Sequence, residues 1–165
     1  MTLFFRYLLV AGLVFLADQA TKLMILANFA MGEYVTLTPF FNLTLLYNPG
    51  AAFSFLADAS GWQRWFFVFL ALAISLWILV LFWRHPERYR ENIALALIMG
   101  GALGNAADRL AYGAVVDFLD FHLGGYSWPA FNLADTGITI GAALLVLDAW
   151  LAGRAGRKIM PDASA

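Results

Sequence analysis

The chain has 165 residues, of which 62% are hydrophobic and only 13% are charged, so its composition predicts a single integral membrane domain rather than a soluble one. A formal net charge of −1 excludes a strongly basic nucleic-acid-binding protein. The lack of cysteine excludes disulfide and thiolate chemistry, and the distant His85 and His122 offer no metal-ligand pattern, so we expect no metal and no other cofactor.

Four apolar stretches are long enough to cross a hydrocarbon core of roughly 30 Å, which takes about 20 helical residues. We place the four spans near residues 7–27, 63–83, 93–112 and 133–152. Two segments between them, 28–62 and 113–132, are predicted to be loops on the outer face. The whole chain, 1–165, is predicted to form one domain. Most basic residues lie at the ends of the spans that face away from these two loops: Arg6, Arg84, Arg88, Arg90, Arg154, Arg157 and Lys158. This bias predicts that both termini are cytoplasmic.

The first span is interrupted by Asp18 and Lys22, which lie one helical turn apart. Opposite charges at this spacing neutralise each other, which is how charge is tolerated in a helix near lipid. We therefore interpret Asp18 and Lys22 as a structural polar pair. The interruption, and the lack of a small-residue cleavage pattern, also favour a retained span over a cleaved signal peptide.

The first outer loop is rich in strand-forming residues from Tyr34 to Tyr47, which predicts a small β-sheet lying on the membrane. The segment Asn48-Pro49-Gly50-Ala51-Ala52-Phe53 follows. Its Pro-Gly pair predicts a turn at Gly50. The amide of Asn48 could additionally bind a peptide backbone.

The third span ends in a run of small and polar residues, from Gly100 to Arg109. Gly100 and Gly104 let neighbouring helices approach closely, which is a packing role. Asn105, Asp108 and Arg109 share one face near the helix end, where we expect protein interior or water. The guanidinium of Arg109 can grip a carbonyl or a carboxylate. The alternative is an Asp108–Arg109 pair that only anchors the helix at the interface.

Asp117 and Asp135 lie on opposite sides of the second outer loop, in short polar islands of an apolar chain. An ionised carboxylate near hydrocarbon is costly, so such acids indicate a functional site. If the loop brings them together, repulsion and desolvation make them share one proton, and the pair can activate water against a peptide carbonyl. Asn132, one turn before Asp135, could orient that carboxylate. The alternative is two solvated interfacial acids.

Two other classes of function are compatible with acids in a membrane protein. One is a small proton or ion transporter that relays charge through Asp18, Asp108, Asp117 and Asp135. These acids cluster toward the outer half, and apart from Asp148 no acid continues the path inward through the four spans, which argues against a relay. The other is a noncatalytic membrane scaffold whose polar residues stabilise helix contacts. A Ser-Lys hydrolase would have to use Lys22 as its base and has little support.

Five segments, taken in order, resemble the motifs of the signal peptidase II family: 18–22, 48–53, 100–109, 115–118 and 131–135. The resemblance spans nearly the whole chain. It implies an all-α membrane protein with four transmembrane helices, a small sheet and a second loop on the outer face. It also implies an aspartic endopeptidase of the bacterial inner membrane that removes the signal peptide of a diacylglyceryl-modified prolipoprotein by cutting before the lipidated cysteine.

The same resemblance assigns roles to individual residues. Asp117 and Asp135 match the catalytic pair. The residues that match substrate-binding or supporting positions are Asn48, Gly50, Asn105, Asp108, Arg109 and Asn132. The expected partners are prolipoprotein substrates, membrane lipid and inhibitors like the cyclic peptide globomycin. Because one chain holds a whole site near the outer leaflet, we expect a monomer to be active.

Overall fold

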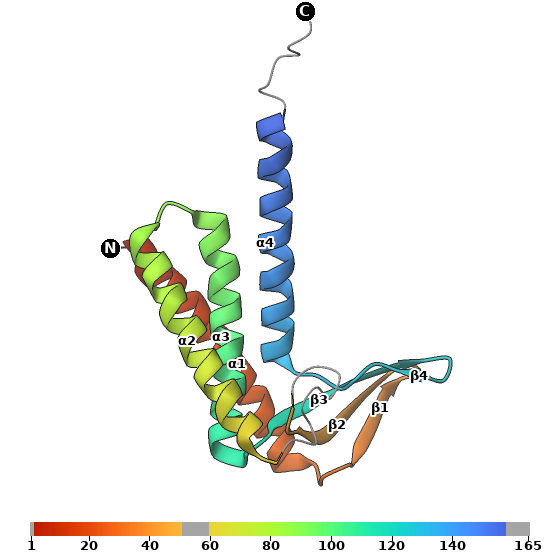
Figure 1. Ribbon diagram of the computed structural model, residues 1–165. Coiled ribbons are helices and arrows are strands. Elements are labelled where there is room, and N and C mark those ends of the chain that lie inside the picture. Colours follow the sequence, from red (N-terminus) through yellow and green to blue (C-terminus); the bar gives the residue numbers. More distant parts are fainter. Residues whose placement is uncertain (1, 51–59, 158–165) are drawn as a thin grey trace, which may run out of the picture.

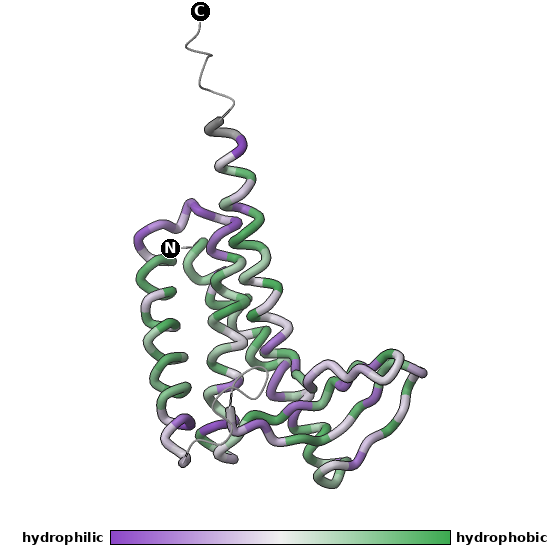
Figure 2. The backbone as a smooth tube through the Cα atoms, turned by 45° about the vertical axis from the view of Figure 1, so that its right-hand side comes forward, coloured by the Kyte–Doolittle hydropathy of each residue, from purple (hydrophilic) through white to green (hydrophobic). Residues whose placement is uncertain are grey.

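The computed structural model describes residues 2–50 and 60–157 of the chain (Figure 1). Within these residues, four helices are long and apolar enough to cross a membrane. They are α1 (Thr2–Asn28), α2 (Trp62–Arg84), α3 (Tyr89–Tyr112) and α4 (Leu133–Arg157). Figure 2 shows hydrophobic residues along the helices, with hydrophilic residues in the α2–α3 connection and where the helices meet the sheet.

The helices extend beyond the apolar stretches that predict them. α3 begins at Tyr89, ahead of the stretch predicted from residue 93, because helices continue through polar residues once they leave hydrocarbon. An ion pair of 3.2 Å between Arg88 and Glu91 spans the start of this helix. α1 likewise begins at Thr2, and α4 continues past residue 152 to Arg157. Hydropathy therefore locates each helix but underestimates its length.

A four-stranded antiparallel sheet, in the order β1-β2-β3-β4, projects sideways from one end of the helices (Figure 1). Its strands are β1 (Tyr34–Thr38), β2 (Phe41–Asn48), β3 (Val115–Leu123) and β4 (Tyr126–Ser127). The sheet predicted for the first outer loop is confirmed. The prediction that 113–132 is only a loop is wrong, because its β-branched and aromatic residues pair with β2.

Alternation along β3 decides where its side chains point. Val116 and Phe118 are buried in a small core with Ile25 of α1 and Leu45 of β2. Successive side chains of a strand point to opposite faces, so Asp117 points the other way, toward the beginning of α4. The strand thus presents one acid to the helix that carries the other.

α3 lies between the other helices and packs against α1, α2 and α4. Close packing is possible because glycines line its surface. A Cβ at Gly100 would lie 2.5 Å from the carbonyl oxygen of Ala11, on α1. The packing role predicted for this glycine is therefore confirmed, and α3 is the element that fixes the positions of its neighbours.

Candidate active site

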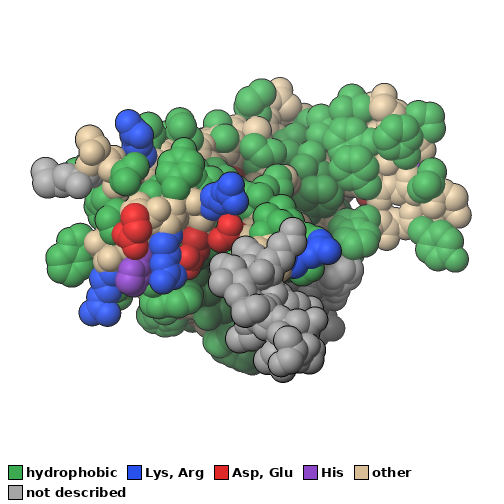
Figure 3. All heavy atoms as spheres, turned by 90° about the horizontal axis from the view of Figure 1, so that it is seen from above, with side chains coloured by type: hydrophobic (Ala, Val, Ile, Leu, Met, Phe, Trp, Pro, Cys, Tyr) green, Lys and Arg blue, Asp and Glu red, His purple; other side chains and the backbone are tan. Residues whose placement is uncertain are grey.

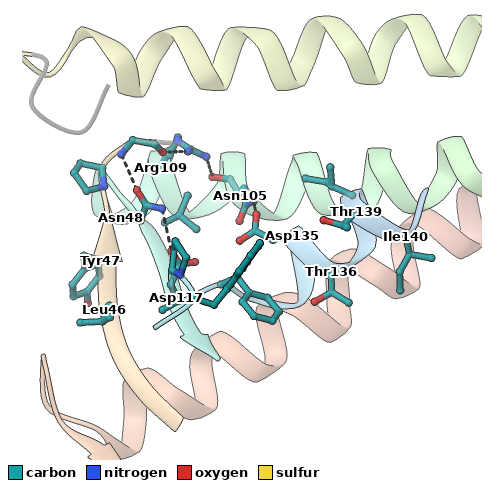
Figure 4. Close-up of a pocket in the computed structure, with 18 residues that line it drawn as sticks. Leu46, Tyr47, Asn48, Asn105, Arg109, Asp117, Asp135, Thr136, Thr139 and Ile140 are labelled. Carbon is teal, nitrogen blue, oxygen red and sulfur yellow. Dashed lines mark hydrogen bonds between the residues drawn. The ribbon is translucent and has the colours of Figure 1, made fainter. Parts of the chain in front are cut away.

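Asp117 and Asp135 line one cavity of about 710 Å³, where the sheet meets the end of α3 and the beginning of α4 (Figure 4). Asn48, Asn105 and Arg109 also line it. The two acids come from β3 and α4, which the chain separates by the β3–β4 hairpin. The structure therefore brings together the two residues that the sequence pattern paired.

Asp117 is almost completely buried, with 3% of its surface exposed. The side-chain amide of Asn132 donates to its Oδ1 (2.7 Å) and that of Asn48 to its Oδ2 (3.2 Å). Burial raises the pKa of Asp117 to about 7, and the nearby charge of Asp135 acts in the same direction. Asp117 can therefore carry a proton at neutral pH, which an ordinary aspartate does not.

This raised pKa predicts a pH-dependent stability difference between Asp117→Asn and the unaltered protein. An unfolded Asp117 ionises near 3.8, while the folded carboxyl keeps its proton up to about 7. Between these values the folded protein binds the extra proton, so the contribution of Asp117 to stability is lost as the pH rises. The variant has no such loss. We expect its melting temperature, relative to the unaltered protein, to rise from pH 4 to 7 and then level off; a constant difference would contradict the shift.

Asp135 stands in the first turn of α4 and is partly exposed to the cavity. The side-chain amide of Asn105 donates to its Oδ1 (2.7 Å). Its own backbone N–H donates to Oδ1 of Asn132 (2.8 Å), the geometry of a helix N-cap. The predicted orienting role of Asn132 thus has a geometric basis: this residue fixes the turn from which Asp135 projects.

Asn132 and Asn105 connect the two acids into one network. Asn132 is fully buried, and its amide nitrogen also lies 3.3 Å from Oδ1 of Asn105. Hydrogen bonds therefore run from Asp117 through Asn132 and Asn105 to Asp135. Such a network orients both carboxyl groups before any substrate arrives.

Arg109 binds the turn that follows β2. Its Nη2 donates to the carbonyl oxygen of Gly50 (2.6 Å), and its guanidinium lies 4.7 Å from the ring centre of Phe67. The backbone N–H of Gly50 in turn donates to Oδ1 of Asn48 (3.0 Å), whose amide holds Asp117. The guanidinium of Arg109 therefore binds a carbonyl of the chain itself, and the amide of Asn48 binds an acid. Binding of a substrate peptide by either residue stays a prediction. Three further residues of this motif, Ala51, Ala52 and Phe53, lie outside the described residues.

Asp18 and Lys22 form the predicted pair, with 2.8 Å between Lys22 Nζ and Asp18 Oδ2. Lys22 also lies 2.7 Å from Oδ2 of Asp108, an ion pair between α1 and α3 that the sequence pattern did not indicate. The alternative Asp108–Arg109 pair is wrong for the described structure, since Asp108 binds Lys22 and Arg109 binds Gly50. With its ammonium between two carboxylates, Lys22 is also unsuited to act as the base of a Ser-Lys hydrolase.

Several residues that line the cavity were not singled out from the sequence. They are Trp128, Pro129 and Phe131 beside the hairpin, and Thr136, Ile138 and Thr139 on α4. A signal existed for the helix, because Thr139 follows Asp135 by four residues and so lies on the same helical face. The hairpin gave no such signal, because its position depends on pairing between β2 and β3.

Comparison with known proteins gives consistent matches over most of the chain. A family described as Signal peptidase (SPase) II matches residues 10–151. The lipoprotein signal peptidase of Ralstonia nicotianae is 63% identical over 133 residues, covering 81% of this chain and 77% of that protein. The lipoprotein signal peptidase of Burkholderia mallei is 58% identical over 136 residues, covering 82% of each chain.

A solved structure of a bacterial membrane enzyme, obtained by the in meso method, has the same fold. It superposes with a TM-score of 0.81 and 33% sequence identity, covering 94% of this chain and 93% of its own. A second such structure gives a TM-score of 0.76, again at 33% identity, covering 87% of this chain and 91% of its own. The chain therefore belongs to the signal peptidase II family, whose lipoprotein signal peptidases remove signal peptides from prolipoproteins.

Proposed function

We propose that Asp117 and Asp135 are the catalytic pair with which this peptidase cuts a diacylglyceryl-modified prolipoprotein just before its lipidated cysteine. The observation that carries the proposal is the shared cavity, in which one amide network holds both carboxyl groups. Asn48, Gly50, Asn105, Asp108, Arg109 and Asn132 support the pair or bind substrate.

The reaction needs one ionised and one protonated carboxyl group. The ionised partner takes a proton from a water molecule, whose oxygen attacks the scissile carbonyl carbon. The protonated partner gives its proton to the carbonyl oxygen. As the tetrahedral intermediate collapses, the C–N bond breaks and the leaving nitrogen takes a proton from the pair. One hydroxyl group of the intermediate gives its proton to the ionised partner, so the pair again holds a single proton. A pKa of about 7 suits Asp117 to hold the shared proton at neutral pH.

The cavity also suits a substrate that is anchored in lipid. From the two acids it continues along the first turns of α4, past Thr136, to Ile138 and Ile140. Acyl chains on the cysteine can follow this apolar side of the helix, which keeps the scissile bond beside Asp135. Anchoring the acyl chains in this way uses binding energy to orient the scissile bond, and such orientation contributes strongly to the rate of cleavage.

We propose that the site lies at the outer leaflet of the bacterial inner membrane, with both termini in the cytoplasm. The beginning of α1 and the end of α4 lie away from the sheet (Figure 1), and charged side chains gather in the view onto that end (Figure 3). Val35, Leu46 and Phe121 are at least 39% exposed and, by strand register, share a sheet face with Asp117. This face suits contact with hydrocarbon, as expected for a sheet lying on the membrane.

The test is incubation of the purified protein, in detergent, with a lipidated and an unlipidated precursor of the same sequence. We expect cleavage of the lipidated precursor only, with the lipidated cysteine at the new N-terminus, and we expect globomycin to block it. Cleavage of neither precursor would indicate a scaffold, and proton flux in liposomes without cleavage would indicate a transporter. Equal cleavage of the lipidated and the unlipidated precursor would contradict the proposal that the enzyme recognises the lipid. A monomer in detergent should show full activity.

A further inference from the structure

Three charged side chains are buried together beside the cavity, although they do not line it. Asp18, Lys22 and Asp108 are each at most 1% exposed. Lys22 Nζ lies within 2.8 Å of both carboxylates. Gln19 adds a neutral link, since its amide donates to Oδ2 of Asp18 (3.1 Å) and to Oδ1 of Asp108 (3.0 Å). We call Asp18, Lys22 and Asp108 the ionic bridge.

Each carboxylate of the ionic bridge also accepts a backbone N–H from outside its own helix. Oδ2 of Asp108 accepts from Val116 (3.0 Å), and Oδ1 of Asp18 accepts from Ala134 (2.9 Å). Val116 comes immediately before Asp117 in β3, and Ala134 comes immediately before Asp135 in α4. Both of the donating backbone N–H groups therefore belong to the residue immediately before a catalytic acid.

We propose that the ionic bridge sets the separation of the two catalytic carboxyl groups, so that Asp18, Lys22 and Asp108 are positioning residues of the reaction. The inference rests on the proposed catalytic pair. One end of the bridge holds β3 at Val116, the other holds the first turn of α4 at Ala134, and Lys22 joins the two ends.

Neutralisation alone would not produce this arrangement. One carboxylate is enough to balance Lys22, yet the cluster holds two, and a second buried carboxylate is costly unless it is fully hydrogen-bonded. Besides the bonds from Lys22 and Gln19, each carboxylate accepts a backbone N–H that lies beside the site and outside its own helix. α4 is thereby capped twice, by Asn132 from its own chain segment and by Asp18 from α1.

The ionic bridge packs against α3 at Gly104, where the lack of a side chain leaves room for it. A Cβ at Gly104 would lie 2.5 Å from Oδ2 of Asp18 and 3.5 Å from Cβ of Ala134. At Gly100, one turn away on the same helix, a Cβ would instead meet the carbonyl oxygen of Ala11 (2.5 Å) and Cβ of Val14 (2.8 Å). Alanine at either position disturbs packing of α3 against α1, but only at 104 does the added Cβ meet a member of the bridge directly.

The test therefore compares the cleavage kinetics of Gly104→Ala and Gly100→Ala with the lipidated precursor as substrate. Size-exclusion chromatography selects the folded fraction of each variant for the measurement. We expect Gly104→Ala to lower kcat by about 10-fold or more with little change in KM, since small misplacements of catalytic groups are costly. Gly100→Ala should lower the melting temperature by a similar amount or more and keep its kcat. Equal kcat values per folded molecule in the two variants would overturn the proposal.

A second comparison, Asp18→Asn with Asp18→Ala, covers the case in which Gly104→Ala does not fold. Asparagine keeps an oxygen that can accept from Ala134 N–H, whereas alanine keeps none. We expect kcat per folded molecule to fall about 100-fold with alanine and distinctly less with asparagine. A kcat equal to that of the unaltered protein in both variants would overturn the positioning role. Failure of the catalytic pair itself is distinguishable, because activity would then survive Asp117→Asn or Asp135→Asn.

Discussion

Replacement of either Asp117 or Asp135 by asparagine is expected to stop cleavage of the lipidated precursor while leaving a folded protein that still binds it. Asparagine has nearly the same shape but can neither take a proton from water nor give one to the carbonyl oxygen. General acid–base catalysis by one positioned group contributes about 10²- to 10⁴-fold, and the loss should lie at the upper end because the two groups act together. Turnover by the purified variants, measured by gel shift of the precursor, reports the loss.

Asp120→Asn is the matched control for this experiment. Asp120 lies on the same strand, three residues after Asp117, but on the opposite face, where its carboxylate accepts from Asn42 (2.9 Å) and Ser127 (3.3 Å). We expect this variant to cleave at the normal rate. Substantial turnover by either Asp117→Asn or Asp135→Asn would rule out a two-carboxyl mechanism.

Lys22→Met is expected to cause the largest loss of stability. Methionine has a similar length but no charge, so Asp18 and Asp108 would stay buried without the cation that lies between them. Removing one partner of a buried ionic group costs about 3–5 kcal/mol. The melting temperature in detergent should fall sharply, and Arg90→Met, which changes an exposed cation, should leave it nearly unchanged.

The same variant offers an internal check. Addition of Asp18→Asn and Asp108→Asn to Lys22→Met removes the unpaired charges, so most of the lost stability should return. A melting temperature that stays low in the triple variant would show that the loss does not come from unpaired charge, but from lost hydrogen bonds such as that from Lys22 to Oδ1 of Asn105 (3.0 Å).

The membrane helices and the paired acids could be predicted from the sequence because their signals are local. Hydropathy locates the four helices, and Asp117 and Asp135 stand out in apolar surroundings. Spacing also paired Asp18 with Lys22, since four residues make one helical turn. Each of these signals lies within a short segment of the chain.

Contacts between segments far apart in the chain could not be predicted from the sequence. The ion pair between Lys22 and Asp108 forms only because α1 and α3 pack with Gly104 facing Asp18. The sequence predicts a loop where β3 forms, because the partner strand β2 lies about seventy residues earlier in the chain. The cavity wall from Trp128 to Phe131 follows from that pairing. Nothing within either segment alone specifies such contacts.

Asn132 touches both halves of the site, and this has a consequence for how the enzyme can change. Its nitrogen holds the carboxylate of Asp117, and its oxygen caps the turn that carries Asp135. Any shift of this one amide moves both acids at once, so in the proposed mechanism activation of water and protonation of the carbonyl cannot be adjusted independently. Adaptation to different lipoproteins must therefore come from the walls around the acids, while the acids and their shared amide stay fixed.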